Sequence, residues 1–129
     1  MATRRIDGPG LAKLETLDAA MTHLQRVNAI VERMAAAARI QQSTAPFKQQ
    51  IVRAATPMVG LLKAQFDQIS EHVTHMIVLT SRGATESVRV RSMREAVAQI
   101  RTQIESAAAR TRQIHAVKDD EDVSGGEAG

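Results

Sequence analysis

One segment of the chain places side chains that can bind a divalent metal ion on one helical face. Asp67, Glu71 and His75 recur every four residues, and His72 lies next to Glu71. Four residues make about one helical turn, and carboxylate oxygens and imidazole nitrogens are common metal ligands. Helical di-iron proteins use Glu-x-x-His pairs, however, and the residue three places after Glu71 is Thr74. We therefore interpret the cluster as a solvated polar face and expect no metal and no other cofactor.

Arginine residues are concentrated near the carboxyl end of the chain. Seven arginines and three glutamates between residues 82 and 112 give this segment a net charge of +4. A basic helix can bind phosphates, so contact with nucleic acid is one hypothesis for function. The residues expected to make that contact are Arg89, Arg91, Arg94 and Arg101. In the alternative interpretation these arginines stay solvated or pair with acids on a neighbouring helix, such as Asp18 and Glu32.

The composition excludes several other kinds of site. The 129 residues include no Cys, which excludes disulfides, thiolate zinc sites, iron–sulfur clusters and cysteine nucleophiles. Trp and Tyr are absent and there are only two Phe, which disfavours aromatic stacking of single-stranded nucleic acid. Gly8 and Gly10 precede an expected helix, but the sequence predicts no strand before them and no Lys-Ser/Thr follows, so we do not expect a phosphate-binding loop. We expect no enzymatic activity and no small-molecule substrate.

Three long helices are expected to position these groups. In the first, over residues 11–42, apolar residues recur at alternating spacings of three and four, a pattern typical of nearly antiparallel or supercoiled helices. The second extends over about residues 46–82, and the third, over about 85–118, has the cleanest alternation. Connections of a few residues make sequence neighbours antiparallel. The sequence predicts an all-α fold, an elongated antiparallel bundle of three long helices that oligomerises.

Local breakers set the expected boundaries. Pro57 interrupts the second helix, so we expect that helix to be kinked or broken there. Gly83 ends it, and Thr85 or Ala84 opens the third helix. Residues 1–10 are predicted to be a flexible amino terminus, and 11–118 the bundle domain. Residues 119–129 are predicted to be a disordered acidic tail, because they carry −5 with one large apolar residue while residues 1–118 carry +8.

The predicted helices carry more apolar surface than a lone three-helix bundle can cover. Each helix of such a bundle needs one apolar stripe, and the first two helices have apolar residues outside theirs. These residues form the expected interface with another molecule: Val27, Ile30, Met34, Val59, Gly60, Leu61, Ile77, Val78 and Leu79. The alternative is that a kink at Pro57 rotates the apolar face and makes both sides internal.

The favoured function is therefore protein assembly. We expect a non-enzymatic structural or interaction protein that forms a homo-oligomer or serves as a small helical subunit of a larger complex. Nucleic-acid binding by the third helix is the second hypothesis, and a metal-binding bundle at Glu71, His72 and His75 is the weakest. The expected partners are the chain itself or another helical protein, with no membrane. The chain shows no apolar run long enough for a secretory signal or a bilayer span, so we expect a cytoplasmic location.

Overall fold

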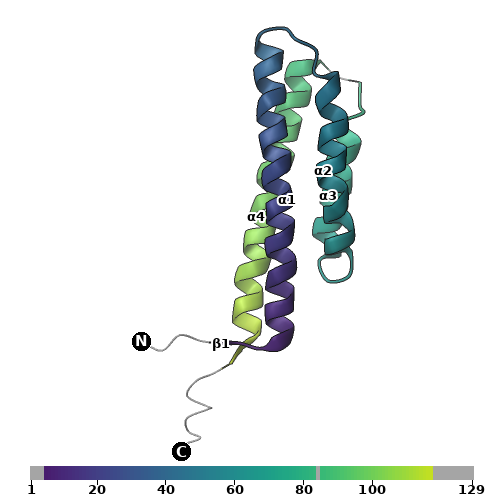
Figure 1. The fold of residues 1–129 in the computed structure, drawn as a ribbon. Coiled ribbons are helices and arrows are strands. Elements are labelled where there is room, and N and C mark those ends of the chain that lie inside the picture. Colours follow the sequence, from purple (N-terminus) through teal and green to yellow (C-terminus); the bar gives the residue numbers. More distant parts are fainter. Residues whose placement is uncertain (1–4, 84, 118–129) are drawn as a thin grey trace, which may run out of the picture.

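The computed structural model describes residues 5–83 and 85–117 of the chain. Within these residues the fold consists of four helices and two short strands (Figure 1). In chain order they are β1 (Arg5–Ile6), α1 (Gly8–Arg39), α2 (Ala45–Lys63), α3 (Asp67–Leu79), α4 (Glu86–Ile114) and β2 (Ala116–Val117). The all-helical, antiparallel packing that the sequence predicts is confirmed. No helix among the described residues is both long enough and apolar enough to cross a bilayer.

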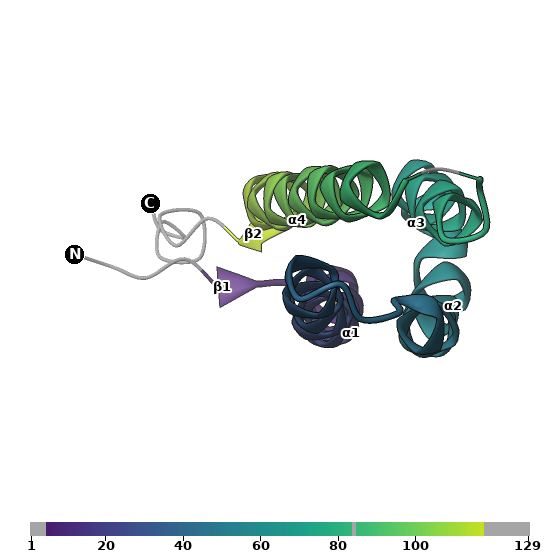
Figure 2. The same cartoon turned by 90° about the horizontal axis from the view of Figure 1, so that it is seen from above.

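The four helices pack in an up-down-up-down order. Seen from above, α1 and α4 form one side of the bundle, and α2 and α3 form the other (Figure 2). Each helix contacts its sequence neighbours, and α1 also contacts α4, which closes the bundle. The hairpin of α2 and α3 is shorter and ends well above the lower ends of α1 and α4 (Figure 1). The α1–α4 pair therefore continues beyond the hairpin.

The prediction of three long helices is wrong, because the described residues form four, and the helix expected to be kinked or broken near Pro57 is not broken there. Helix α2 continues through Pro57, whose side chain is exposed, and ends at Lys63. The chain reverses over residues 64–66, where Phe66 leaves helical geometry with φ −137° and ψ 54°. The Ser70 hydroxyl then donates to the Val59 carbonyl at 2.9 Å and ties α3 to α2. A proline on a solvent-facing side costs one backbone bond, and packing of the inner face holds the helix together across it.

This reversal explains the apolar surplus of the first helix. Val27 and Met34 are fully buried and Ile30 is 8 % exposed, and all three belong to the hydrophobic core cluster of the described residues. They offer no surface to another molecule, so the structure removes these three residues from the expected interface. The physical reason is that the second predicted helix folds back on itself and supplies a fourth helix. Both apolar sides of α1 thereby become internal, as in the alternative interpretation, with the reversal at residues 64–66.

The two ends of the chain meet at the foot of the α1–α4 pair. Strands β1 and β2 are antiparallel, and the Asp7 backbone N–H donates to the His115 carbonyl at 3.0 Å. The Asp7 carboxylate accepts from the Gly10 N–H at 2.8 Å, which caps α1, and lies 3.0 Å from His115 Nδ1. We refer to residues 5–10 with 115–117 as the terminal clasp. The expected flexible segment 1–10 is thus structured from Arg5 onward, while the predicted acidic tail, 119–129, lies outside the described residues.

The upper end of the bundle is joined by a different set of polar contacts. The Thr85 hydroxyl accepts from the Val88 N–H at 3.3 Å, which confirms Thr85 as the cap that opens the last helix. In the first turn of that helix, the Glu86 carboxylate accepts from the buried Thr44 hydroxyl at 2.8 Å. This bond connects the loop before α2 with the start of α4.

A substitution at Gly10 tests the terminal clasp. A Cβ atom added there would collide with His115 Cβ and Ile6 Cγ2, whereas a Cβ at Gly8 would meet no atom within 4 Å. We expect Gly10→Ala to lower the free energy of unfolding by about 1–3 kcal/mol, because the clasp must shift to make room. Gly8→Ala is the matched control and should change it little. Urea unfolding measures both, and equal stability of Gly10→Ala and wild type would contradict the clasp.

Candidate functional site

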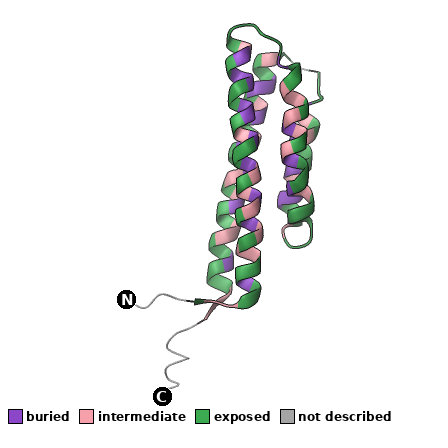
Figure 3. Cartoon of the chain, viewed as in Figure 1, coloured by how far each residue is buried: buried purple, intermediate pink, exposed green. Residues whose placement is uncertain are grey.

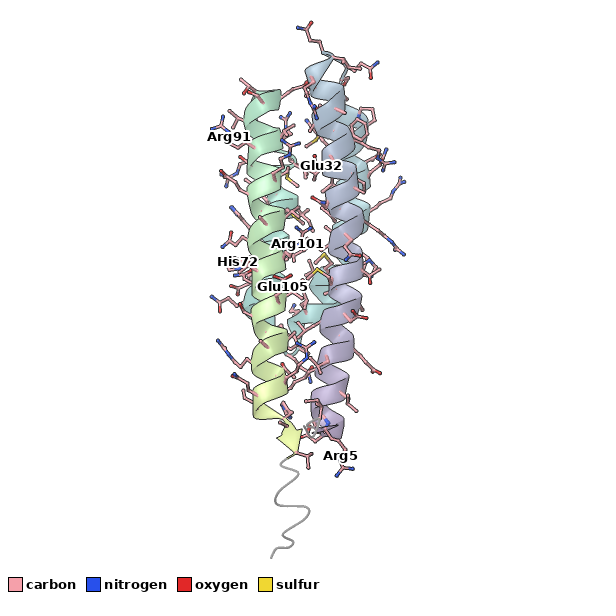
Figure 4. All side chains as sticks on the ribbon, turned by 90° about the vertical axis from the view of Figure 1, so that its left-hand side faces the viewer. Arg5, Glu32, His72, Arg91, Arg101 and Glu105 are labelled. Atoms are coloured by element: carbon pink, nitrogen blue, oxygen red, sulfur yellow. The ribbon has the colours of Figure 1, made fainter. Side chains whose placement is uncertain are left out.

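One long surface of the α1–α4 pair is not covered by any described element. The α2–α3 hairpin packs on one side of this pair, and Figure 4 views the pair from the opposite side, with the hairpin behind it. Between the two helices on this side lie two hollows, one at each end. We call this surface the outer groove. It combines an apolar floor with concave shape at both ends and is therefore our candidate site.

The hollow near the terminal clasp has an apolar floor and an acidic rim. Its volume is about 480 Å³. The floor consists of Leu11, Leu14, Leu17, Met21, Ile104 and Ala108. Leu11 is 52 % exposed and extends the apolar floor to the surface of the chain. The charged rim residues are Glu15, Asp18, Glu105 and Arg112, which give this acidic end a net charge of −2.

The hollow at the other end has the opposite charge. Its volume is about 410 Å³, and its floor is made of Ala35, Ala38 and Val90. The charged rim residues are Arg39, Arg91, Arg94 and Glu86, which give this basic end a net charge of +2. Burial decreases along the pair from this end toward the terminal clasp, where exposed and half-buried residues predominate (Figure 3).

An ion pair bridges the two helices next to the basic end. Arg94 Nη2 lies 2.7 Å from Glu32 Oε1, and Arg94 Nε donates to Glu32 Oε2 at 2.9 Å, so the pair is bidentate. The hydrogen bonds from Arg94 hold the pKa of Glu32 below its ordinary value, and Glu32 raises the pKa of Arg94 in return. For Glu32 the interpretation that arginines pair with acids on a neighbouring helix is confirmed. With Glu32 counted, the net charge of the basic end is +1.

The four arginines expected to bind phosphate do not form one surface. Arg89 is buried, and its guanidinium donates to the Arg82 carbonyl at 3.0 Å. Arg94 is engaged by Glu32. Arg91 is exposed at the outer edge of α4, while Arg101 is half-buried and lies farther down the helix, on the side toward α1 (Figure 4). Two of the four side chains are therefore occupied inside the chain, and the other two lie at different heights.

The remaining residues of the expected interface lie on the hairpin. Gly60, Leu61 and Val78 are exposed, with 38 % of Leu61 and 46 % of Val78 accessible. Val59, Ile77 and Leu79 are half-buried and pack against the core. These six residues belong to α2 and α3 and are separate from the outer groove, so a partner contact through them stays a prediction.

Sequence reasoning missed the outer groove. Leu14 and Met21 follow the alternating spacing of the first predicted helix, a pattern that predicts interior positions, yet they are half-buried at the surface of the groove. The available signal was the acidic pair Glu15 and Asp18 directly beside them, which marks the solvent-facing side of that seam.

The candidate metal ligands do not come together. His72 Nδ1 lies 2.6 Å from Gln103 Nε2 on α4, while Glu71 and His75 are exposed on α3. Among residues 5–83 and 85–117, no three His, Asp or Glu side chains are placed so that they can hold a metal ion. The arrangement links α3 to α4 through His72 and gives no support to a metal site.

Comparisons of the chain with protein-family models, with curated proteins and with solved structures found no match.

The ion pair between α1 and α4 predicts a specific pH dependence. Because the pKa of Glu32 is lowered in the folded chain, the pair stabilises the fold above the ordinary glutamate pKa and loses this effect as pH falls through the lowered value. Arg94→Ala should raise the pKa of Glu32 toward its ordinary value, as measured by NMR titration of the side-chain carboxyl carbon. Arg91→Ala, an exposed arginine of the same helix, is the control and should leave it unchanged. An identical Glu32 titration in wild type and Arg94→Ala would disprove the pair in solution.

Proposed function

We propose that this protein is a non-enzymatic, cytoplasmic interaction protein that binds another helical element in the outer groove. The observation that carries this proposal is the uncovered apolar floor between α1 and α4, with Leu11, Leu14 and Met21 at the surface. Two parallel ridges with an apolar floor between them are the surface on which a further helix packs in helical bundles.

The rim of the groove supports recognition of a protein. Charged side chains flank the floor at both ends and are mostly exposed, so they remain solvated until a partner arrives. Exposed charges around an apolar centre add orientation and association rate more than affinity. The combination of an apolar floor and a charged rim is the anatomy of a protein–protein interface.

Nucleic-acid binding has less support from the described contacts. The hypothesis requires Arg89, Arg91, Arg94 and Arg101 to present guanidinium groups together. The internal bonds of Arg89 and Arg94 would have to be given up first. Protein assembly uses the groove as it is, so we favour it.

A photo-cross-linking residue at Leu14 tests the proposal in the native host. Leu14 lines the groove and is half-buried, so a reactive side chain there would touch any molecule seated on the floor. We expect ultraviolet light to produce covalent adducts with protein, which are detected by a mass shift of the tagged chain and identified by mass spectrometry. The same residue at Gln49, an exposed position on α2, is the matched control and should give none.

The result at Leu14 decides the proposal. Adducts at Leu14 that are absent at Gln49 support the groove as a protein-binding surface. No protein adduct at Leu14, or equal adducts at both positions, would overturn it.

A further inference from the structure

We propose that the occupant of the outer groove is a second copy of this chain, turned end for end. In this arrangement the acidic end of one groove lies on the basic end of the other, and the reverse holds at the far end. The inference rests on the proposed function, because it names the partner of the same surface. It predicts a dimer in which α1 and α4 of both copies form a central four-helix layer, with each α2–α3 hairpin on the outside.

Charge along the groove selects this orientation. A symmetric dimer uses the same surface on both copies, so a two-fold axis must relate the two grooves. An axis parallel to the helices would place acidic end on acidic end and basic end on basic end. An axis perpendicular to the helices places an acidic end, with a net charge of −2, against a basic end at both ends of the dimer. The net charge of the basic end is +2, or +1 when Glu32 is counted. Only the perpendicular axis makes the groove complementary to itself.

The size of the surface suits a stable dimer. Helices α1 and α4 contain 32 and 29 residues, so each is roughly 45 Å long, and two packed helices are roughly 20 Å wide. The product is roughly 900 Å² for each copy, and specific interfaces of standard size bury about 800 Å² for each partner.

The middle of the groove permits close approach. The two-fold axis must lie midway between the two hollows, because it exchanges them. This places the axis near residue 27 of α1. Ala29 is exposed, and it lies three helical turns from Asp18 and therefore on the same face. On α4, the exposed Ala98 lies two turns before Glu105. The small side chains at these two positions leave room for the facing helices, and Arg101, three residues after Ala98, is half-buried beside them.

Cysteine cross-linking tests the arrangement directly, because the chain contains no natural Cys. Because the axis lies near residue 27, each α1 residue faces an α1 residue of the other copy. The two facing residues are the same number of positions away from residue 27, one before it and the other after it. Asp18 therefore faces Ala36; both are exposed, and five helical turns separate them, so they share one face. We expect a mixture of Asp18→Cys and Ala36→Cys chains to form a disulfide-linked pair on mild oxidation. Neither variant alone should do so.

Charge reversal provides the second test. The double variant Glu15→Lys/Asp18→Lys makes the acidic end basic, and Arg39→Glu/Arg91→Glu makes the basic end acidic. Each double variant should raise the dimer Kd at least tenfold, because like charges then meet at both ends. The combined quadruple variant should restore the dimer, which a loss of folding cannot imitate. Sedimentation equilibrium at low salt measures Kd from the balance of 14.0 kDa monomer and dimer of about 28 kDa, and circular dichroism confirms the helical content of each variant.

The outcomes separate this inference from the proposed function. A dimer that is cross-linked by the mixed cysteines and restored by the quadruple variant supports the end-for-end pair. A chain that remains monomeric at hundreds of micromolar would overturn the second copy as occupant. So would a dimer that forms but is insensitive to the charge reversals. Adducts from the Leu14 position with a different protein would then leave the proposed function standing, whereas their absence would end both.

Discussion

The rest of the structure depends on the need to cover α1 on two sides. Leu24, Val27, Val31 and Met34 of α1 are all buried, and α1 contacts both α2 and α4, so a single neighbouring helix would leave part of this apolar surface in water. Each such side chain contributes about 1.5–3 kcal/mol when it is removed from water. The reversal after Lys63 gives α1 its second neighbour, and α3 then fills the remaining corner of the bundle. The four-helix arrangement thus covers the apolar surface of α1 on both sides.

The unequal lengths of the helices mean that the two ends of the α1–α4 pair are held together by different contacts. Because α2 and α3 are short, they stabilise α1 and α4 only along the upper part of the pair (Figure 1). At the lower end the terminal clasp takes over: Asp7 caps α1 and bonds to His115 just after α4. The cap and the pair of strands connect the start of α1 to the end of α4. They fix the position of α1 along its axis relative to α4. The outer groove therefore has a defined register along its length.

The sequence predicts the parts of this fold that follow from local chemistry and periodicity. The helical pattern, a cap at Thr85 or Ala84 and the pairing of arginines with acids such as Glu32 can be predicted, because each depends on residues within a turn or on the spacing of charges along a helix. The reversal at residues 64–66 cannot, because Ala64, Gln65 and Phe66 include neither proline nor glycine and suit a helix as well as a turn. Two-residue strands carry no period, so β1 and β2 could not be predicted. The outer groove was missed because the spacing of a helical seam does not reveal which of its flanks another helix covers.

The distribution of charge connects the fold to the proposed function. A basic helix is often interpreted as a phosphate-binding surface, and α4 has the composition for it. In the fold, however, Arg89 turns to the Arg82 carbonyl and Arg94 to Glu32, so the positive charge is partly used to hold α4 in place. What remains exposed is a gradient along the groove, acidic at the terminal clasp and basic at the upper end. A uniform phosphate backbone cannot match a surface whose sign changes along its length, because attraction at one end is opposed by repulsion at the other. A folded partner with its own fixed charges can match it, and for that reason the charge pattern favours protein over nucleic acid as the ligand of this groove.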